Sequence, residues 1–453
     1  MVLETGSLDL LKPALAKLEE SYNDLPEFSQ SIDEKKLKEV LIEVAERMKD
    51  NYPYPHPLYA GQMLKPPHPV ARLAYMLSLF VNPNNHALDG GRASSAMEKE
   101  AVAAIAQMLG FKTHLGHLCG GGTMANLEAL WVAGRLAPGK LVVASNQAHY
   151  THSRITEVLG IPFKAVAVDE RGRMDIEDLD RILEEEEVGS VVVTTGTTAL
   201  GSVDPLPAIL DLREKYGFRI HVDAAYGGYF KLAENLDTEA RAAFDRIGEA
   251  DSAVIDPHKH GLQPYGCGCV LFKDPAVGAL YKHDSPYTYF SSSELHLGEI
   301  SLECSRPGSA AVALWATQRL LPMTAKGEFA DDLAKSRKAA LELYERLKQD
   351  SRFLTPLVPE LDIVIFAVNA ESAEESSRMA RTIFEDTAKK GLHLALANLP
   401  VKLFPESMLK DRTQEYVTCL RSCLMKPEHL DWLDEIWQKL DLAMVDVGQK
   451  VLS

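Results

Sequence analysis

The chain has 453 residues, 46% of them hydrophobic, and a formal net charge of −17. This length and apolar content are enough for a large core and about two or three domains. The acidic balance argues against a nucleic-acid partner, because phosphate backbones are bound by clustered lysine and arginine. No apolar run reaches the roughly 18 residues of a membrane span, and the first residues lack a basic and then apolar leader. We therefore expect a cytosolic protein with neither nucleic acid nor membrane as a partner.

The six cysteines are too few for a disulfide scaffold, and none has the spacing of a zinc ribbon. Cys267 and Cys269 lie two apart in a predicted strand, and Cys419 and Cys423 lie four apart. No second Cys or His pair lies near Cys267 and Cys269 in the sequence, and the evidence for a metal site at Cys419 and Cys423 is equally weak. We therefore predict no metal site.

Residues 1–58 are predicted to form an N-terminal arm. Ser31 to Glu34 matches a capping box, and apolar residues then recur at helical spacing, at Leu37, Val40, Leu41 and Val44. The stretch that follows, NYPYPHPLYAGQMLKPPHP, is dense in proline and aromatic residues, so it must be extended or looped.

Between about residues 95 and 275, predicted helices alternate with short apolar runs. Helices are expected from Glu98 to Leu109 and from Thr123 to Arg135. The strand-like runs are Leu141 to Ala144, Phe163 to Val168, Ser190 to Thr194, Arg219 to Val222 and Ser252 to Ile255. This alternation predicts an α/β fold, with a mostly parallel sheet covered by helices on both faces.

After about residue 325 the pattern changes. A long helix from Asp331 to Lys348 precedes two strand-like runs, Leu361 to Val368 and Tyr416 to Leu424, and a last helix. These elements predict a smaller α+β domain. We therefore divide the chain into an arm (1–58), a large α/β domain (59–325) and a small C-terminal domain (326–453).

Polar residues follow the predicted parallel strands, at the sheet edge where α/β proteins bind ligands. His149 follows one run, Thr197 and Thr198 another, Asp223 a third, and His258 with Lys259 a fourth. A lysine amine can form an imine with an aldehyde, and a carboxylate can keep a pyridine nitrogen protonated so that the ring accepts electrons. Together, Asp223 and Lys259 predict an imine-forming electron-sink cofactor.

Three further segments fit such a cofactor. Ala225 in HVDAAYGG could pack beneath one face of a ring, and His149 could stack on the other face; alternatively, His149 is a core histidine satisfied by a backbone carbonyl. The segment LCGGGTMANLEAL places Gly121, Gly122 and Thr123 at the start of a predicted helix. Backbone N–H groups and the helix dipole there favour an anion such as phosphate, although a plain loop capped by Thr123 is also possible. The segment matches neither a dinucleotide-binding nor a Walker A motif.

These motifs resemble those of the group II amino-acid decarboxylases, a family of fold-type I pyridoxal 5′-phosphate (PLP) enzymes. The resemblance runs from about residue 50 to 325, more weakly beyond, and rests on SNQAHYTHSR, TTGTTALGSVDP, HVDAAYGG and DPHKHG in this order. It implies a mostly parallel seven-stranded sheet, an L-amino-acid substrate with an aromatic or acidic side chain, and a homodimer. The chain departs from the family's usual TSGGSEAN, because it reads CGGGTMAN at 119–126. This departure puts assignment to any one member in doubt.

The resemblance also implies a role for each matching residue. Lys259 would carry the cofactor as a Schiff base, Asp223 would pair with its ring nitrogen, and His149 would stack on the ring. Thr123 and His258 would hold the phosphate, with Thr197 beside the cofactor.

Two further assignments concern the substrate. Arg306 in SRPGSAAVALWA would bind the substrate carboxylate, or else form a structural salt bridge. Tyr287 or Tyr289 in HDSPYTYFSSSELHLGE would return a proton to the substrate carbon, or else pack against a partner subunit. Alternatives to decarboxylation are a PLP-dependent carbon–carbon lyase resembling sphingosine-phosphate lyases, an aminotransferase, and a cofactor-binding protein without catalysis.

Overall fold

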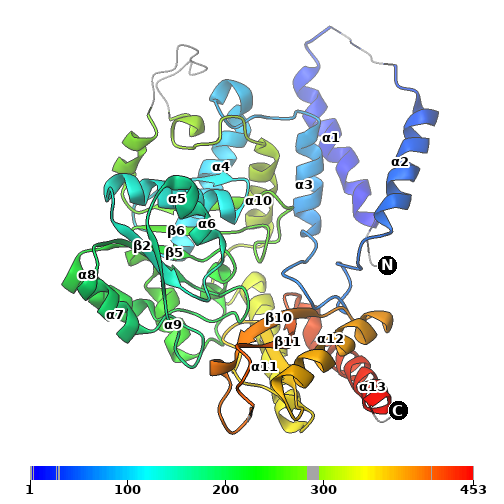
Figure 1. The fold of residues 1–453 in the computed structure, drawn as a ribbon. Helices are drawn as coiled ribbons and strands as arrows, with labels where there is room; N and C mark the ends of the chain where they lie inside the picture. The colour runs from blue at the N-terminus through cyan, green and yellow to red at the C-terminus, as the bar shows by residue number, and fades with distance from the viewer. Residues whose placement is uncertain are drawn as a thin grey trace.

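The computed structural model describes residues 3, 5–26, 28, 31–282, 295–409 and 411–451. Two sheets organise the described residues (Figure 1). The larger sheet has seven strands in the order β1-β7-β6-β5-β4-β2-β3. Their bounds are Leu115–Cys119 (β1), Leu141–Ser145 (β2), Phe163–Val166 (β3), Val188–Thr194 (β4), Arg219–Asp223 (β5), Ser252–Ile255 (β6) and Gly268–Phe272 (β7).

The prediction of a mostly parallel sheet is confirmed. Strands β3, β2, β4, β5 and β6 pair in parallel, whereas β7 is antiparallel to both β6 and β1. The edge strand β1 was not predicted, because Gly116 and His117 interrupt its apolar residues. The parallel strands end at one edge of the sheet, so the residues that follow them lie near one another.

Helices cover the large sheet, and short 3-10 helices connect some of its elements. The α-helices are α3 (Pro69–Leu79), α4 (Leu88–Leu109), α5 (Gly122–Leu136), α6 (Thr151–Leu159), α7 (Ile176–Glu185), α8 (Leu206–Tyr216), α9 (Thr238–Asp245) and α10 (Gly308–Leu320). The 3-10 helices here are η3 (Gly228–Leu232), η4 (Ile247–Glu249), η5 (Pro275–Leu280) and η6 (Leu297–Glu299). Helix α4 begins ten residues before the predicted Glu98, because it continues across a kink at Gly91, where φ is −169° and ψ is 63°.

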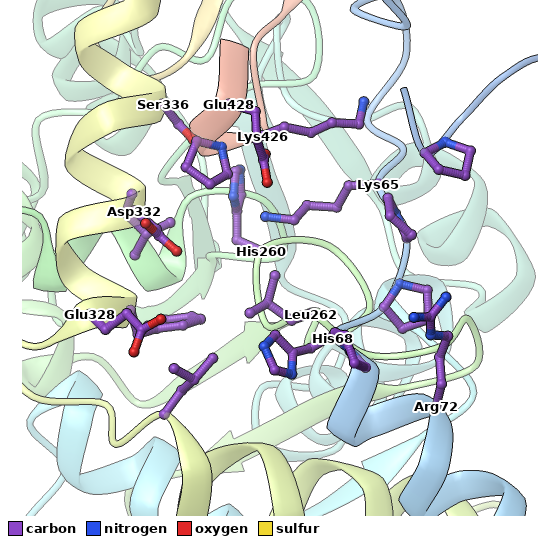
Figure 2. Close-up of a pocket in the computed structure, with 18 residues that line it drawn as sticks. Lys65, His68, Arg72, His260, Leu262, Glu328, Asp332, Ser336, Lys426 and Glu428 are labelled. Carbon is purple, nitrogen blue, oxygen red and sulfur yellow. The ribbon is translucent and has the colours of Figure 1, made fainter. Parts of the chain in front are cut away.

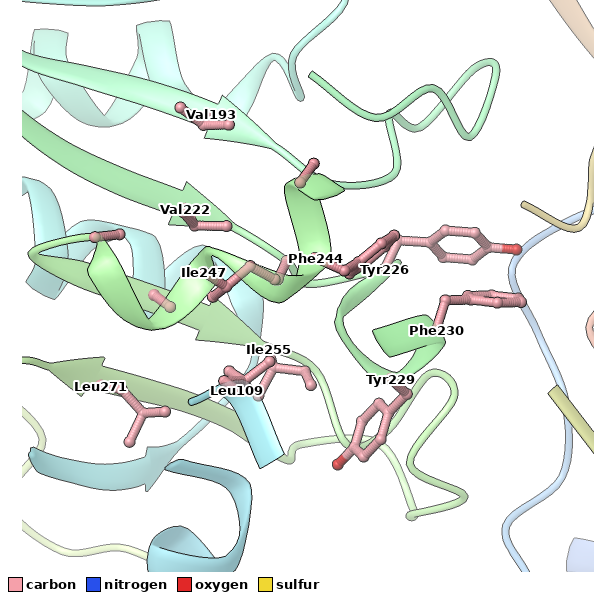
Figure 3. Close-up of a cluster of buried hydrophobic side chains, with 14 of the residues drawn as sticks. Leu109, Val193, Val222, Tyr226, Tyr229, Phe230, Phe244, Ile247, Ile255 and Leu271 are labelled. Carbon is pink, nitrogen blue, oxygen red and sulfur yellow. The ribbon is translucent and has the colours of Figure 1, made fainter. Parts of the chain in front are cut away.

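The main core lies between the sheet and its helices (Figure 3). Val193, Val222 and Ile255 come from adjacent strands and are fully buried. Phe244 and Ile247, near the end of α9 and in η4, pack in the same cluster. Burying an aliphatic or aromatic side chain contributes about 1.5–3 kcal/mol, so this cluster holds the parallel strands in the arrangement that places their carboxyl ends together.

The smaller sheet is antiparallel, in the order β10-β11-β9-β8. Its elements are β8 (Phe353–Leu354), β9 (Ile363–Val368), β10 (Ala395–Pro400), β11 (Tyr416–Cys423), α11 (Glu328–Gln349), α12 (Ala373–Lys389), α13 (Leu433–Val451), η7 (Val401–Leu403) and η8 (Pro427–Leu430). Strands β9 and β11 match the two predicted runs. Leu361, Cys423 and Met425 belong to the main core, so the two sheets share apolar packing.

The N-terminal arm contains α1 (Leu11–Glu19) and α2 (Glu34–Met48), with η1 (Thr5–Leu10) and η2 (Glu20–Tyr22), and stands to one side of the body (Figure 1). The capping box expected at Ser31 is wrong. Asp33 is the N-cap, because its carboxylate accepts a hydrogen bond from Lys36 N at 3.1 Å. No described residue of α1 or α2 is buried. Within the described residues, no helix has the length and apolar content needed to cross a membrane.

Candidate active site

A cavity of about 500 Å³ opens at the carboxyl edge of the parallel strands. Its lining comes from the loops after β2, β4, β5 and β6 and from the start of α5. It includes predicted residues from each of these segments except the loop after β4, namely Gly121, Gly122, Thr123, His149, Asp223, Ala225, His258 and Lys259. The fold therefore brings together residues that lie more than a hundred positions apart in the chain.

Lys259 lies in this cavity with a carboxylate beside it. Its Nζ is 3.0 Å from Asp256 Oδ2, and Asp256 is 3% exposed in its side chain. Both residues lie in the segment that follows β6, where the chain turns back toward β7. Asp256 Oδ1 is buried and makes no hydrogen bond among the described residues. The amine is thus held at the cavity wall by one oxygen of a carboxylate whose other oxygen has no partner among the described residues.

Asp223, the last residue of β5, is held from two sides. His152 Nε2 is 2.8 Å from Asp223 Oδ2, and Ala225 N donates to Asp223 Oδ1 at 3.1 Å. Burial alone would raise the pKa of Asp223, but the hydrogen bond and charge of His152 and the nearby Lys259 lower it well below its ordinary value. Asp223 is therefore an anion inside the cavity, as a partner for a protonated ring nitrogen must be.

A second line of hydrogen bonds connects Asp223 to the glycine-rich loop. Asn126 Nδ2 lies 2.9 Å from Gly122 O and 3.5 Å from Asp223 Oδ2. Its Oδ1 is 2.8 Å from His221 Nε2, and His221 Nδ1 is 2.9 Å from Ser252 Oγ. Burial lowers the pKa of His221 to about 3, so the ring is neutral at ordinary pH. A neutral ring that donates from Nε2 then accepts at Nδ1.

The glycine-rich loop has a backbone that suits an anion. Gly121 precedes α5 with φ of 137°, a conformation that favours glycine. A Cβ at Gly268 would lie 2.5 Å from the Gly121 carbonyl carbon, so strand β7 and the loop make a close backbone contact. The N-terminus of α5 faces the cavity through Gly122 and Thr123. Its unpaired N–H groups and dipole favour a phosphate group there.

Two histidines complete the described walls. His149 Nδ1 is 2.8 Å from Thr151 Oγ1, and its ring stacks on Tyr150 at 4.6 Å. Burial lowers the pKa of His149, which favours a neutral ring suited to stacking. His258 Nδ1 is 2.8 Å from Cys267 O, and its ring packs 4.9 Å from that of Tyr265.

Other predicted site residues lie elsewhere. Thr197 is fully buried and its Oγ1 accepts a hydrogen bond from Ser202 N at 3.0 Å, whereas Thr194 and Thr198 line the cavity. Tyr287 and Tyr289 fall outside the described residues.

Arg306 does not line the described part of the cavity. It is 5% exposed, and its Nη1 pairs with Glu98 Oε1 at 2.9 Å and also donates to Leu118 O. This is the structural salt bridge that the sequence left as the alternative.

Comparisons with known proteins identify the family of this chain. A model described as "Pyridoxal-dependent decarboxylase conserved domain" matches residues 15–369. The chain belongs to the pyridoxal-dependent decarboxylases. An L-tyrosine decarboxylase from Enterococcus faecium is 29% identical over 412 residues, which cover 69% of this chain and 67% of that protein. An L-aspartate decarboxylase from Thermococcus kodakarensis is 30% identical over 282 residues, covering 62% of this chain and 72% of the relative.

Solved structures share the fold of this decarboxylase. The mouse protein CSAD has a TM-score of 0.77 at 23% identity, with 94% of this chain and 91% of that chain covered. The Oryza sativa protein TDC, solved with PLP and tryptamine, has a TM-score of 0.75 at 19% identity, with 96% and 95% covered. The fold-type I architecture expected from the resemblance is confirmed, and the chain is a PLP-dependent amino-acid decarboxylase by family.

The cavity of the decarboxylase fits PLP. Lys259 offers an amine for the aldehyde, Asp223 an anion for the ring nitrogen, and the start of α5 a set of donors for the phosphate. Two buried oxygens beside it, Asp256 Oδ1 and Thr194 Oγ1, make no hydrogen bond among the described residues. Such atoms are rare in folded proteins unless a water or ligand pairs with them.

Sequence reasoning missed several residues of this decarboxylase site, and four of them make polar contacts there. His152, Asn126 and Asp256 contact predicted residues directly, and Glu303 Oε2 accepts a hydrogen bond from Gly120 N at 3.1 Å. Asp256 stands in the recognised DPHKHG segment, so its position before Lys259 was a usable signal. His152 follows His149 by three residues, on the first turn of α6, and that spacing also places both near the sheet edge. Glu303 is brought in by a remote segment, for which the sequence offers no local signal.

Proposed function

We propose that this decarboxylase removes the carboxylate of an L-amino acid with an aromatic or acidic side chain and releases CO₂ and the amine. The observation that carries the proposal is the shared cavity of Lys259, anionic Asp223 and the α5 N-terminus. Relatives named for tyrosine and for aspartate support these two substrate classes.

The residues of this chain act by position and charge. When bound, PLP supplies a ring that accepts the electron pair left when the Cα–carboxylate bond breaks. Asp223 would keep a proton on the ring nitrogen, because its anionic form is stabilised by His152. Lys259 is the attachment point, with Asp256 beside its amine. His149 would cover one face of a bound ring and Ala225 the other, and the start of α5 with His258 would hold the phosphate, since all of these line the cavity.

Decarboxylation must be followed by return of a proton to the substrate carbon. We assign this step to Tyr287 or Tyr289, which lie outside the described residues. Thr197 stays assigned to the cofactor's surroundings through its neighbours Thr194 and Thr198, which line the cavity. The assignment of Arg306 to the substrate carboxylate also stays a prediction. It would require Arg306 to exchange its buried partner Glu98 for substrate.

The described lining favours the aromatic class. Apolar and aromatic side chains of Met124, Leu127, Tyr226 and Tyr265 share the cavity with the carboxylate of Glu303. Apolar walls suit an aromatic side chain, and a carboxylate can accept a hydrogen bond from a phenol or indole donor. An acidic substrate side chain would meet repulsion from Glu303, unless a cation from outside the described lining pairs with it.

Cofactor attachment is tested by replacing the lysine. The Lys259→Ala variant is expected to lose the visible absorbance of the cofactor and decarboxylation, and borohydride reduction with peptide mapping should label Lys259 in the parent. Lys273→Ala, at an exposed lysine that donates to Glu249 O, is the matched control and should behave as the parent. An unchanged spectrum in Lys259→Ala would overturn the assignment.

The reaction and substrate are tested with a panel of L-amino acids. Release of CO₂ from L-tyrosine or L-tryptophan, with no requirement for a keto acid, is the expected result. L-Aspartate and L-glutamate are the acidic members of the panel. Strict dependence on a keto acid would identify an aminotransferase, and an aldehyde formed from a phosphorylated amino alcohol would identify a carbon–carbon lyase.

We also propose that the decarboxylase is a homodimer, and that α2 contributes to the contact. Leu37, Val40, Leu41 and Val44 lie on this helix with exposed fractions of 47%, 47%, 58% and 51%. An apolar helix face of this kind is normally covered in the working molecule. Light scattering should give a dimer, and Leu41→Glu should weaken it, whereas Glu39→Lys on the same helix should not. An active monomer would contradict the proposal. The cytosolic location expected from the sequence stays a prediction.

A further inference from the structure

A second cavity, of about 220 Å³, lies where four distant segments meet (Figure 2). The proline-rich segment and the start of α3 form one side, and the first turns of α11 form another. The residues after Lys259 and the stretch from 426 to 428 close the rest. Among the residues lining the two cavities none is shared, so this one is separate from the cofactor site.

Cationic and polar groups lie deep in this second cavity. In Figure 2 the side chain of Lys65 extends from the proline-rich segment toward His260. Lys65 Nζ donates to Met425 O at 3.1 Å. Burial lowers the pKa of Lys65, and the carboxylates of Glu428, Asp362 and Asp332 oppose that shift. His260 is 1% exposed, and neither ring nitrogen makes a hydrogen bond of good geometry in the described structure, although Nε2 is 3.3 Å from Asp362 Oδ2. Buried donors of this kind usually have a partner.

Two carboxylates lie on the α11 side of the cavity, and a third lies close to Lys65. Glu328 and Asp332 of α11 lie on the side opposite Arg72 (Figure 2), and Glu428 lies near Lys65. Asp332 also pairs with Lys335 at 3.0 Å on the surface of the helix. Between the two signs of charge, the walls are apolar, formed by Pro66, Pro67, Leu262, Phe329 and Leu333.

The presence of both signs of charge in one small cavity selects a class of ligand. A simple anion would meet the carboxylates of α11, and a simple cation would meet Lys65 and Arg72. A small zwitterion satisfies both, with its carboxylate toward Lys65 and its ammonium toward Asp332, because charge-assisted hydrogen bonds form at both ends. We propose that the second cavity binds a free amino acid, held at its carboxylate by Lys65 and at its ammonium by Asp332.

The second cavity is connected to the cofactor site through packed side chains. His260 directly follows Lys259 in the chain, and its ring packs edge-on against Tyr226 at 4.8 Å. Tyr226 lines the cofactor cavity, and its hydroxyl donates to Asp362 Oδ1 at 2.6 Å. A ligand that contacts His260 therefore reaches both Lys259 and Tyr226 through direct contacts.

The binding experiment uses holoenzyme reduced with borohydride, so that the cofactor cannot exchange Lys259 for an added amine. L-Alanine is compared by calorimetry and saturation-transfer NMR with propionate, which lacks the ammonium, and ethylamine, which lacks the carboxylate. We expect L-alanine to bind, and both fragments to bind about tenfold more weakly or worse, because each loses a charge-assisted contact.

Variants assign the binding to this cavity. Lys65→Met and Asp332→Asn should each weaken L-alanine binding about tenfold or more, whereas Lys338→Met, at an exposed lysine of α11, should leave it unchanged. Cofactor absorbance before reduction verifies that each variant is folded. Absence of L-alanine binding, propionate binding as tightly as L-alanine, or unchanged binding in both Lys65→Met and Asp332→Asn would overturn the proposal. Because binding is measured directly, it can fail while amino-acid decarboxylation stands, and the reverse.

Discussion

His152 Nε2 lies 2.8 Å from Asp223 Oδ2, and both side chains are almost fully buried. The contact joins the first turn of α6 to the end of β5, so the orientation of Asp223 depends on a helix that follows a different strand. A carboxylate that must meet a ring nitrogen in one direction needs such a fixed orientation. His152 is thus a positioning residue for Asp223.

Replacement of His152 should weaken the binding of PLP. A hydrogen bond to a charged group contributes about 1.5–3 kcal/mol, so in His152→Phe we expect the affinity for PLP to fall about tenfold or more. Absorbance titration of the apoenzyme with PLP measures this. His114→Phe, at a partly exposed histidine before β1, should bind as the parent does. Equal affinity in His152→Phe and the parent would mean that Asp223 is oriented without His152.

The close contact between Gly268 and Gly121 predicts a difference between two glycine variants. A Cβ at Gly268 meets the backbone of Gly121, which cannot move without displacing the anion-binding loop. We expect Gly268→Ala to lose PLP affinity by about tenfold or more, since steric overpacking typically costs about 1–3 kcal/mol. In Gly120→Ala the nearest atom is the tip of the flexible Glu303 side chain at 3.3 Å, and a shift of this tip by a few tenths of an ångström relieves the contact. PLP titration should therefore separate the two, and similar affinities would contradict the steric argument.

The buried pair of Arg306 and Glu98 predicts a loss of stability. Removal of one partner leaves the other charge buried, which costs about 3–5 kcal/mol. Arg306→Met should therefore unfold at lower denaturant concentration, and the double variant with Glu98→Gln should recover part of the loss. Denaturation followed by circular dichroism measures this. A raised KM for the amino acid without loss of stability would instead favour the substrate-binding role.

His221 predicts how stability responds to acid. Its pKa falls from 6.5 in the unfolded chain to about 3 in the fold, so the unfolded chain binds the proton more readily. The contribution of neutral His221 to the free energy of unfolding is complete above pH 6.5. It is lost as the pH falls toward 3, by about 1.4 kcal/mol per pH unit. His429, whose pKa is also lowered to about 3, adds a similar share. Unfolding measured across this window should be less pH-dependent in His221→Gln, by about one proton; an identical slope would contradict the assignment.

The strands of the large sheet were predictable because each parallel strand is a short apolar run with both faces buried. Strands β2 to β6 therefore stand out against their polar neighbours, as at Val191 to Val193. The edge strand β1 and the start of α4 could not be predicted in this way, because glycines and polar residues interrupt their apolar patterns. Asp33 replaced Ser31 as the N-cap for a related reason, since several nearby residues can serve and only the backbone conformation selects one.

By itself, the sequence determined the order of the elements and the residue types at the strand ends, because both depend on local pattern and on short motifs around Asp223 and Lys259. Only the tertiary structure decided which side chains touch. It paired Arg306 with Glu98, oriented Asp223 with His152, and joined four distant segments around Lys65 and His260. The physical reason is that a hydrogen bond or an ion pair depends on a distance of about 3 Å. Chain spacing does not specify such a distance between residues that are far apart in sequence.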